Sequence, residues 1–199
     1  MADDIKVKTP HQRTISALVQ DRPGVLSRIS GLFRRRGFNI SSLAVGRSEK
    51  SGLSRMTFVV EGSENVLKNV SDQLEKLIDV VEAKDITEKN IVWRELALIK
   101  VKFNQKNRSE ILELASIFRA NVIDIGVETV TMETTGGRNK IDSLIELLKK
   151  FTVREVIRTG RVATMRGTLT PGMDDGEFQY QPTNTTPAQP EISEGTGSV

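Results

Sequence analysis

The sequence predicts an α+β fold made of two tandem ferredoxin-like units, each with the element order βαββαβ. Three observations support this prediction: alternating apolar runs typical of strands, helical segments with apolar residues three or four apart, and a second copy of the pattern after a polar linker. We expect a flexible N-terminus, a first unit, a linker, a second unit and a disordered tail, at residues 1–12, 13–87, 88–93, 94–166 and 167–199.

The first unit begins with a strand in which Ile15, Ala17 and Val19 alternate with other residues. An amphipathic helix follows the turn at residues 21–24 and ends at Gly37, because proline near the start and glycine just past the end are usual at helix termini. Ser63 is the expected N-cap of the second helix. The four strands are expected at residues 13–20, 39–48, 53–61 and 78–86.

The second unit repeats this order. Asn107 is the expected cap of its first helix, with Glu110 three residues later, and its second helix follows Gly136 and Gly137. The Pro-Gly turn of the first unit is not repeated, since the matching place reads Asn-Gln-Lys-Asn at residues 104–107. The four strands are expected at residues 95–103, 121–126, 127–134 and 151–162.

Charge is divided unevenly between the body of the chain and its tail. The 199 residues carry a formal net charge of +3, but the tail from Gly167 holds five acids and no Lys or Arg, which leaves +8 on residues 1–166. A basic body is compatible with an anionic partner. The tail also holds four of the six prolines, and its polar composition cannot bury enough apolar surface to fold, so we expect it to be disordered.

The composition excludes several classes of protein. With 37% hydrophobic and 5% aromatic residues, small aliphatic cores are favoured over one large core. No apolar run reaches the roughly 18 residues of a membrane span, and residues 1–10 lack the apolar region of a secretory signal. The absence of cysteine excludes disulfides and thiolate metal sites and fits a cytoplasmic location.

Catalytic chemistry finds little support in the sequence. The single histidine, His11, precedes the first expected strand in a segment expected to be mobile, and no metal-binding, phosphate-loop or nucleophile motif is present. A self-contained enzyme is therefore disfavoured. The run Arg34–Arg36 falls in the last turn of a helix, where cations complement the helix dipole. Because few aromatic residues accompany it, we interpret this run as a solvated face or a protein interface rather than a nucleic-acid site.

The turn Asp21–Gly24 is the one segment with the character of a ligand site. It joins a strand to a helix N-terminus, where the first backbone N–H groups have no internal partner and the helix dipole adds positive charge. Glycine at this point lets a ligand approach the backbone. The pattern is a candidate carboxylate or phosphate site, although most such turns simply connect a strand to a helix.

Several segments of the chain resemble one family. They read DRPGVLSR at 21–28, GFNI at 37–40, SL at 42–43, LSRMT at 53–57, DVV at 79–81, REL at 94–96, IFRA at 117–120 and ID at 123–124. Together they resemble the regulatory small subunit of acetolactate synthase, also called acetohydroxyacid synthase, over about residues 10–166. The DRPG turn alone would indicate only an ACT domain, a module that many amino-acid-regulated enzymes share.

The resemblance implies that the first unit is an ACT domain and that the chain is a non-catalytic subunit of a transferase complex acting on pyruvate. In this family the small subunit raises the activity of a large catalytic subunit, which carries thiamine diphosphate, Mg and FAD. It implies no cofactor, nucleic acid or membrane for this chain. The small subunit also confers feedback inhibition by branched-chain amino acids, chiefly valine, at sites between the ACT domains of a homodimer.

Carried over by residue, the effector site comprises Gln20, Asp21, Gly24, Val25 and Leu26 of one protomer with Asn39 and Ile40 of its partner. The chemistry of a free amino acid agrees with this set. Backbone N–H groups near Gly24 suit the carboxylate, the oxygens of Asn39 and Asp21 accept from the ammonium, and apolar side chains suit an aliphatic group. Some members of the family carry Asn in place of Asp21, whose charge favours the ammonium but repels the carboxylate.

Two alternatives of other classes remain at this stage. An ACT-domain amino-acid sensor could regulate another enzyme or a transcription complex, but binding DNA directly would require a helix-turn-helix segment, and none is visible. A stand-alone metabolic enzyme would have to turn over its substrate without a partner. Mixing with DNA and a pyruvate-consumption assay discriminate these alternatives from a regulatory subunit.

Overall fold

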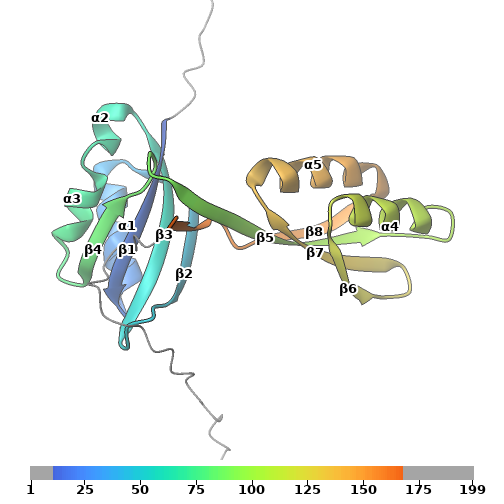
Figure 1. The fold of residues 1–199 in the computed structure, drawn as a ribbon, viewed down its shortest axis with the longest axis horizontal. Coiled ribbons are helices and arrows are strands. Elements are labelled where there is room, and N and C mark those ends of the chain that lie inside the picture. The colour runs from blue at the N-terminus through green and yellow to red at the C-terminus, as the bar shows by residue number, and fades with distance from the viewer. Residues whose placement is uncertain (1–10, 168–199) are drawn as a thin grey trace, which may run out of the picture.

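The computed structural model describes residues 11–167 and confirms the α+β class, with two antiparallel sheets in two ferredoxin-like domains. In each domain the helices cover one face of the sheet, and strand β5 runs from one domain into the other (Figure 1). Each domain buries its own hydrophobic cluster, which includes Ile15 and Phe58 in the first and Ile99 and Met132 in the second. The expectation of small separate cores is met.

The first domain has the strand order β2-β3-β1-β4, with every neighbouring pair antiparallel. Its elements are β1 (His11–Gln20), α1 (Val25–Arg36), β2 (Asn39–Arg47), β3 (Leu53–Gly62), α2 (Glu64–Leu67), α3 (Val70–Glu75) and β4 (Val80–Asp85). Strands β2 and β4 form its edges, so β2 leaves one side of its backbone open for pairing.

The second domain has the equivalent order β6-β7-β5-β8. Its elements are β5 (Ile91–Lys102), α4 (Arg108–Ile117), β6 (Asn121–Ile125), β7 (Thr129–Gly136), α5 (Arg138–Leu148), the 3-10 turn η1 (Lys149–Phe151), β8 (Val153–Arg158) and β9 (Val162–Met165). Strand β9 lies outside this order and pairs with the N-terminal part of β5, from Ile91 to Arg94.

Helix α1 follows the expectations at both of its ends. Gly24 precedes it with φ 87° and Gly37 follows it with φ 70°, conformations that glycine adopts without strain. The three arginines at 34–36 occupy its last turn, as expected. On the inner face, the ring of Phe33 packs edge-on against Phe58 at 5.3 Å between centroids, which fixes the helix on the sheet.

The two domains also share details at the start of their second strands. Asn39 pairs with Glu61 across β2 and β3, and Asn121 pairs with Glu133 across β6 and β7. In both domains the register shifts a residue or two later, between Ile40 and Ser42 in β2 and after Val122 in β6. The repeat predicted from the sequence therefore extends to the bulges.

Several local expectations need correction. His11 is the first residue of β1, paired with Gly62, rather than part of a segment before the strand. The second helix is interrupted and forms α2 and α3. Ser63 is the N-cap residue of α2, as expected, but it makes no capping side-chain bond. The last strand divides into β8 and β9, because Gly160 between them has φ 79°. Strand β5 starts at Ile91, inside the segment 88–93 expected as a linker.

The tail expectation falls on residues 168–199, which lie outside the described part of the chain, as do residues 1–10. Among residues 11–167, no helix is both long and apolar enough to pass through a bilayer. Nor does any cluster of three or more His, Cys, Asp or Glu side chains in this range offer a metal site.

Candidate functional site

Backbone hydrogen bonds fix the turn before α1 at Gln20, Asp21 and Gly24. The N–H of Gln20 donates to the Asp79 carbonyl and the N–H of Asp21 to the Gly52 carbonyl, both at 2.9 Å. The Gly24 carbonyl accepts the N–H of Arg28 at 3.0 Å, which begins the helix. This arrangement leaves the first N–H groups of α1 directed at the turn, where an anion is stabilised.

Two arginines around this turn meet at one buried carboxylate. Asp79, whose side chain is 1% exposed, accepts Arg22 Nε at 2.7 Å and also bonds Arg28 Nε from α1. The hydrogen bonds from Arg28 and then Arg22 hold the pKa of Asp79 below its usual value. Asp79 thus joins the end of the α3–β4 connection to the turn.

The cluster of Arg22, Arg28 and Asp79 was not predicted from the sequence, because Asp79 lies 51 residues after Arg28. Arg28 bends back toward the helix start, so a Cβ at Gly24 would lie 3.3 Å from Arg28 Nη1. A positive guanidinium therefore lies beside the bare N–H groups. The only sequence signal was that DRPG, the arginine four residues after the glycine and DVV recur together in the family it resembles.

Not every expected residue can contact a ligand with its side chain. Val25 is 3% exposed and belongs to the core, so only its backbone N–H faces the turn. Leu26 is 44% exposed and can cover an apolar group. The Asp21 carboxylate is half-exposed and lies 3.9 Å from Arg47 Nε at the end of β2, a distance at which the arginine partly offsets its charge.

Asn39 and Ile40 lie at the start of β2. The Asn39 amide nitrogen donates to Glu61 Oε2 at 3.3 Å, so its oxygen is the end of the amide that can accept from a ligand. Ile40 is half-buried and packs against the first core, together with Leu43. Asn39 is exposed, which makes its oxygen accessible.

The structure does not bring the two groups of expected residues together within one chain. The turn at Gly24 precedes α1, whereas Asn39 follows its last residue, and a helix of 12 residues is about 18 Å long. A free amino acid is too small to span that distance. The residues from Gln20 to Leu26 form one continuous site fragment, and Asn39 with Ile40 form another.

The equivalent turn of the second domain is closed by its own side chains. Asn104 Oδ1 accepts the N–H groups of Lys106 at 2.9 Å and Asn107 at 3.1 Å, while Asn107 Oδ1 accepts the Asn104 N–H at 2.7 Å. Asn107 is at the N-cap position of α4, as expected, but its side chain is used within the turn and makes no capping hydrogen bond. These bonds occupy N–H groups near the helix start, so the first domain offers the more open site.

Comparison with known proteins gives matches to both domains. Residues 15–82 match the family described as "AHAS small subunit-like ACT domain", and residues 94–167 match "Small subunit of acetolactate synthase". The probable acetolactate synthase small subunit of Archaeoglobus fulgidus is 47% identical over 156 residues, or 78% of this chain and 98% of the relative. The acetolactate synthase small subunit of Mycobacterium bovis is 46% identical over 159 residues, or 80% of this chain and 95% of the relative.

A solved structure is similar over the same range. The crystal structure of the acetolactate synthase small subunit from Thermotoga maritima has a TM-score of 0.74 and 41% sequence identity to this chain. The match covers 80% of this chain and 99% of the Thermotoga maritima chain. Sequence and fold therefore agree on one family.

Proposed function

Because the chain belongs to the family of acetolactate synthase small subunits, we propose that it raises the turnover of a separate catalytic subunit and makes that subunit sensitive to valine. The catalytic subunit supplies the thiamine diphosphate, Mg and FAD. The present chain supplies no reacting group to pyruvate. Its role is to bind an amino acid and to bias the activity of its partner.

One observation supports the proposed valine site: the bare helix N-terminus at Gly24 and the exposed Asn39 amide lie beyond opposite ends of α1, a helix of 12 residues that is about 18 Å long. Both fragments are suited to parts of an amino acid, yet neither can bind all of it. A second copy of the chain that pairs through its first domain would bring Asn39 of one protomer to the turn of the other. The open edge of β2 supports such a homodimer.

In this site the valine carboxylate binds the N–H groups at the start of α1, near Gly24 and Val25. Its ammonium donates to the Asn39 oxygen of the partner protomer and to the Asp21 carboxylate. Its isopropyl group packs against Leu26 and the partner's Ile40, which are the accessible apolar side chains of the set. Arg47, 3.9 Å from Asp21, reduces the repulsion between that side chain and the valine carboxylate.

Reconstitution with the catalytic subunit tests the proposal. Acetolactate formation from pyruvate is measured with this chain alone, with the catalytic subunit alone and with both, at increasing valine concentration. We expect no activity from this chain alone, a higher rate from the mixture than from the catalytic subunit alone, and a fall in that rate with valine. Acetolactate formation by the isolated chain, or an unchanged rate in the mixture, would overturn the proposal.

A further inference from the structure

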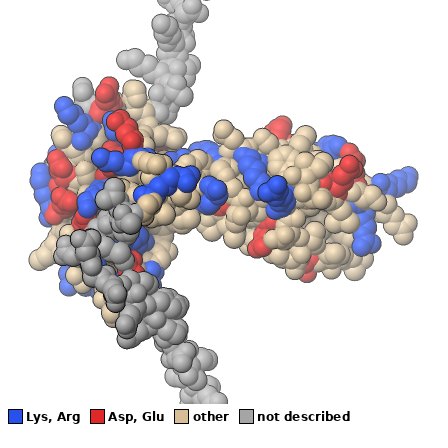
Figure 2. All heavy atoms as spheres, in the orientation of Figure 1, with Lys and Arg blue, Asp and Glu red and all other residues tan. Residues whose placement is uncertain are grey.

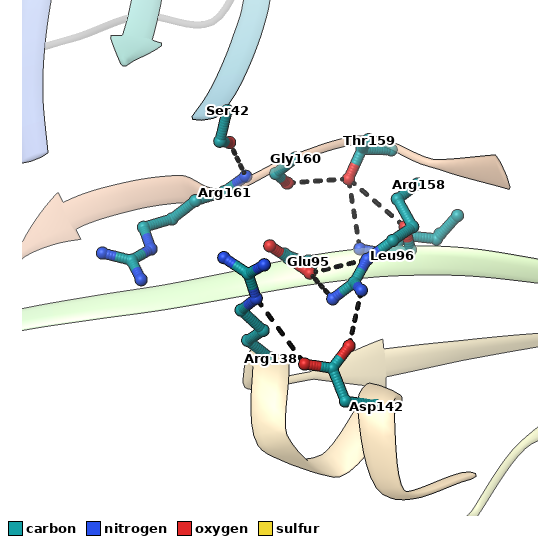
Figure 3. A network of polar contacts seen from close by, with 9 residues as sticks. All are labelled: Ser42, Glu95, Leu96, Arg138, Asp142, Arg158, Thr159, Gly160 and Arg161. Carbon is teal, nitrogen blue, oxygen red and sulfur yellow. Dashed lines mark hydrogen bonds and ion pairs between the residues drawn. The ribbon is translucent and has the colours of Figure 1, made fainter. Parts of the chain in front are cut away.

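The connection between β8 and β9 crosses from the second domain onto the face of the first sheet that no helix covers (Figure 1). The Arg161 N–H donates to Ser42 Oγ at 2.7 Å, and Arg161 Nη1 donates to Thr14 Oγ1 at 2.8 Å. Gly160 passes so close to β2 that a Cβ there would lie 2.6 Å from Ser42 Oγ. The two domains are therefore in direct polar contact at this point (Figure 3).

Arg161 is also held from the side of the second domain. Its guanidinium lies 4.3 Å from the centroid of the Trp93 ring, a cation–π contact. The far edge of the same ring packs on Gly137, where a Cβ would be 3.4 Å away. This stacking fixes the Arg161 side chain without neutralising its charge.

A second group of charges lies beside it, in the second domain. Arg158 donates through Nε to Glu95 Oε2 at 3.1 Å and through Nη1 to Asp142 Oδ1 at 2.6 Å. Arg138, the first residue of α5, approaches the same Asp142 with its Nε at 3.6 Å and extends from the helix toward β5 (Figure 3). Both carboxylates thus have Arg158 as their nearest cation.

A cavity of about 290 Å³ lies between these groups and the first domain. Its lining comprises Ser41, Ser42, Leu43, Val59, Glu95, Arg138, Arg158, Thr159, Gly160 and Arg161. Three arginines face two carboxylates, Glu95 in the lining and Asp142 behind it, which leaves one positive charge in excess. Basic side chains also gather on the surface over the junction of the two domains (Figure 2).

The excess charge is concentrated on Arg161 and Arg138. Among the described residues, Arg161 Nε is buried and makes no hydrogen bond. Burial lowers the pKa of the Arg161 guanidinium, and the positive charge of Arg138 lowers it further, against the opposite effect of Glu95. A negative group between the two arginines would relieve this repulsion.

We propose that this inter-domain cavity binds a small phosphate-type oxyanion between Arg138 and Arg161, with the Ser42 hydroxyl, whose oxygen accepts the Arg161 N–H, as a further polar contact. Guanidinium groups bind tetrahedral oxyanions through charge-assisted hydrogen bonds. The volume is at the lower end of the roughly 300–1,000 Å³ of small-molecule sites, which suits inorganic phosphate and is too small for a nucleotide. Since the lining comes from both domains, the anion also stabilises their arrangement.

Calorimetric titration of the full chain with inorganic phosphate tests the site, with sodium chloride and acetate titrations at matched ionic strength. Arg138 is half-exposed, so Arg138→Gln preserves the fold and is expected to weaken phosphate binding at least about tenfold. Arg161→Gln should weaken it by at least as much. The control is Arg154→Gln, an exposed arginine of β8 outside the cavity lining, which should bind phosphate like the wild type.

Thermal unfolding gives a second readout that does not depend on heat signals. Phosphate should raise the melting temperature of the wild type and of Arg154→Gln more than equal ionic strength of chloride does, and should lose this effect in Arg138→Gln. No phosphate-specific binding to the wild type would overturn the proposal. Equal affinity in Arg138→Gln, or equal stabilisation by acetate, would overturn the assignment to a phosphate-type anion at this cavity.

Discussion

Replacing Asn39 by alanine is expected to separate amino-acid sensing from folding and activation. Asn39 is exposed at the start of edge strand β2, and its side chain makes one hydrogen bond within the described chain, to Glu61 at 3.3 Å. Glu61 keeps a second donor, since Gln12 Nε2 donates to its Oε1 at 2.7 Å. The change therefore leaves no buried group unpaired, and the stability of the first domain should be nearly unaffected.

The expected effect on valine follows from the loss of one acceptor for its ammonium. A hydrogen bond to a charged group contributes about 1.5–3 kcal/mol. At about 1.4 kcal/mol per factor of ten, the valine concentration for half-inhibition should rise about 10- to 100-fold. Gly24→Asp is expected to be harsher, because it puts a side chain at φ 87° and a negative charge beside the N–H groups proposed to bind the carboxylate.

The assay is a valine titration of acetolactate formation by the reconstituted complex. The second domain offers a matched control in Asn121→Ala, since the Asn121 amide donates to Glu133 at 3.1 Å in the same register position. That variant should keep wild-type valine sensitivity, and both variants should still activate the catalytic subunit. Unchanged inhibition in Asn39→Ala, or equal resistance in Asn121→Ala, would refute the assignment of Asn39 to the site.

Three further predictions concern stability and the tail. Asp79 has a folded pKa below its unfolded value, so its contribution to the free energy of unfolding is complete above about pH 4 and is lost as the pH falls through the folded pKa. Asp79→Asn should therefore flatten the acid side of a profile of melting temperature against pH, and an unchanged profile contradicts this. Phe33→Ala should lower the free energy of unfolding of the first domain by about 3–5 kcal/mol in denaturant titrations, and a loss below about 1 kcal/mol contradicts its burial. A chain ending at Arg166 keeps all of β9 and should retain its circular dichroism, activation and valine inhibition; loss of activation would assign the tail a contact with the catalytic subunit.

The elements that the sequence predicted well are those whose pattern is local. The alternation of Ile15, Ala17 and Val19 predicts β1, and the glycines at 24 and 37 delimit α1, because turn and strand preferences act over a few residues. The repeat of this pattern then predicts the second sheet, with the same strand order. The expected effector residues of the turn likewise lie next to one another, since they are consecutive in the chain.

What the sequence did not predict depends on contacts between distant residues. Asp79 lies 51 residues after Arg28 and 57 after Arg22, and only the fold brings the three together. Arg161 donates a hydrogen bond to Thr14, which lies 147 residues earlier, so no local sequence pattern indicates this contact between the domains. Residues 159–162 were expected as the end of one strand because nothing in their composition marks the left-handed Gly160 as a crossing between domains.

Strand β5 makes the two similar halves of this chain inseparable. Its first four residues pair with β9, and its remaining residues pair with β7 and β8, in one continuous backbone from Ile91 to Lys102. A cut at the formal boundary near Arg94 would fall inside a strand and leave unpaired edges on both fragments, which are sites of aggregation. Although the halves are built alike, the chain is therefore not a pair of exchangeable modules, and recombination between relatives has to preserve this strand whole.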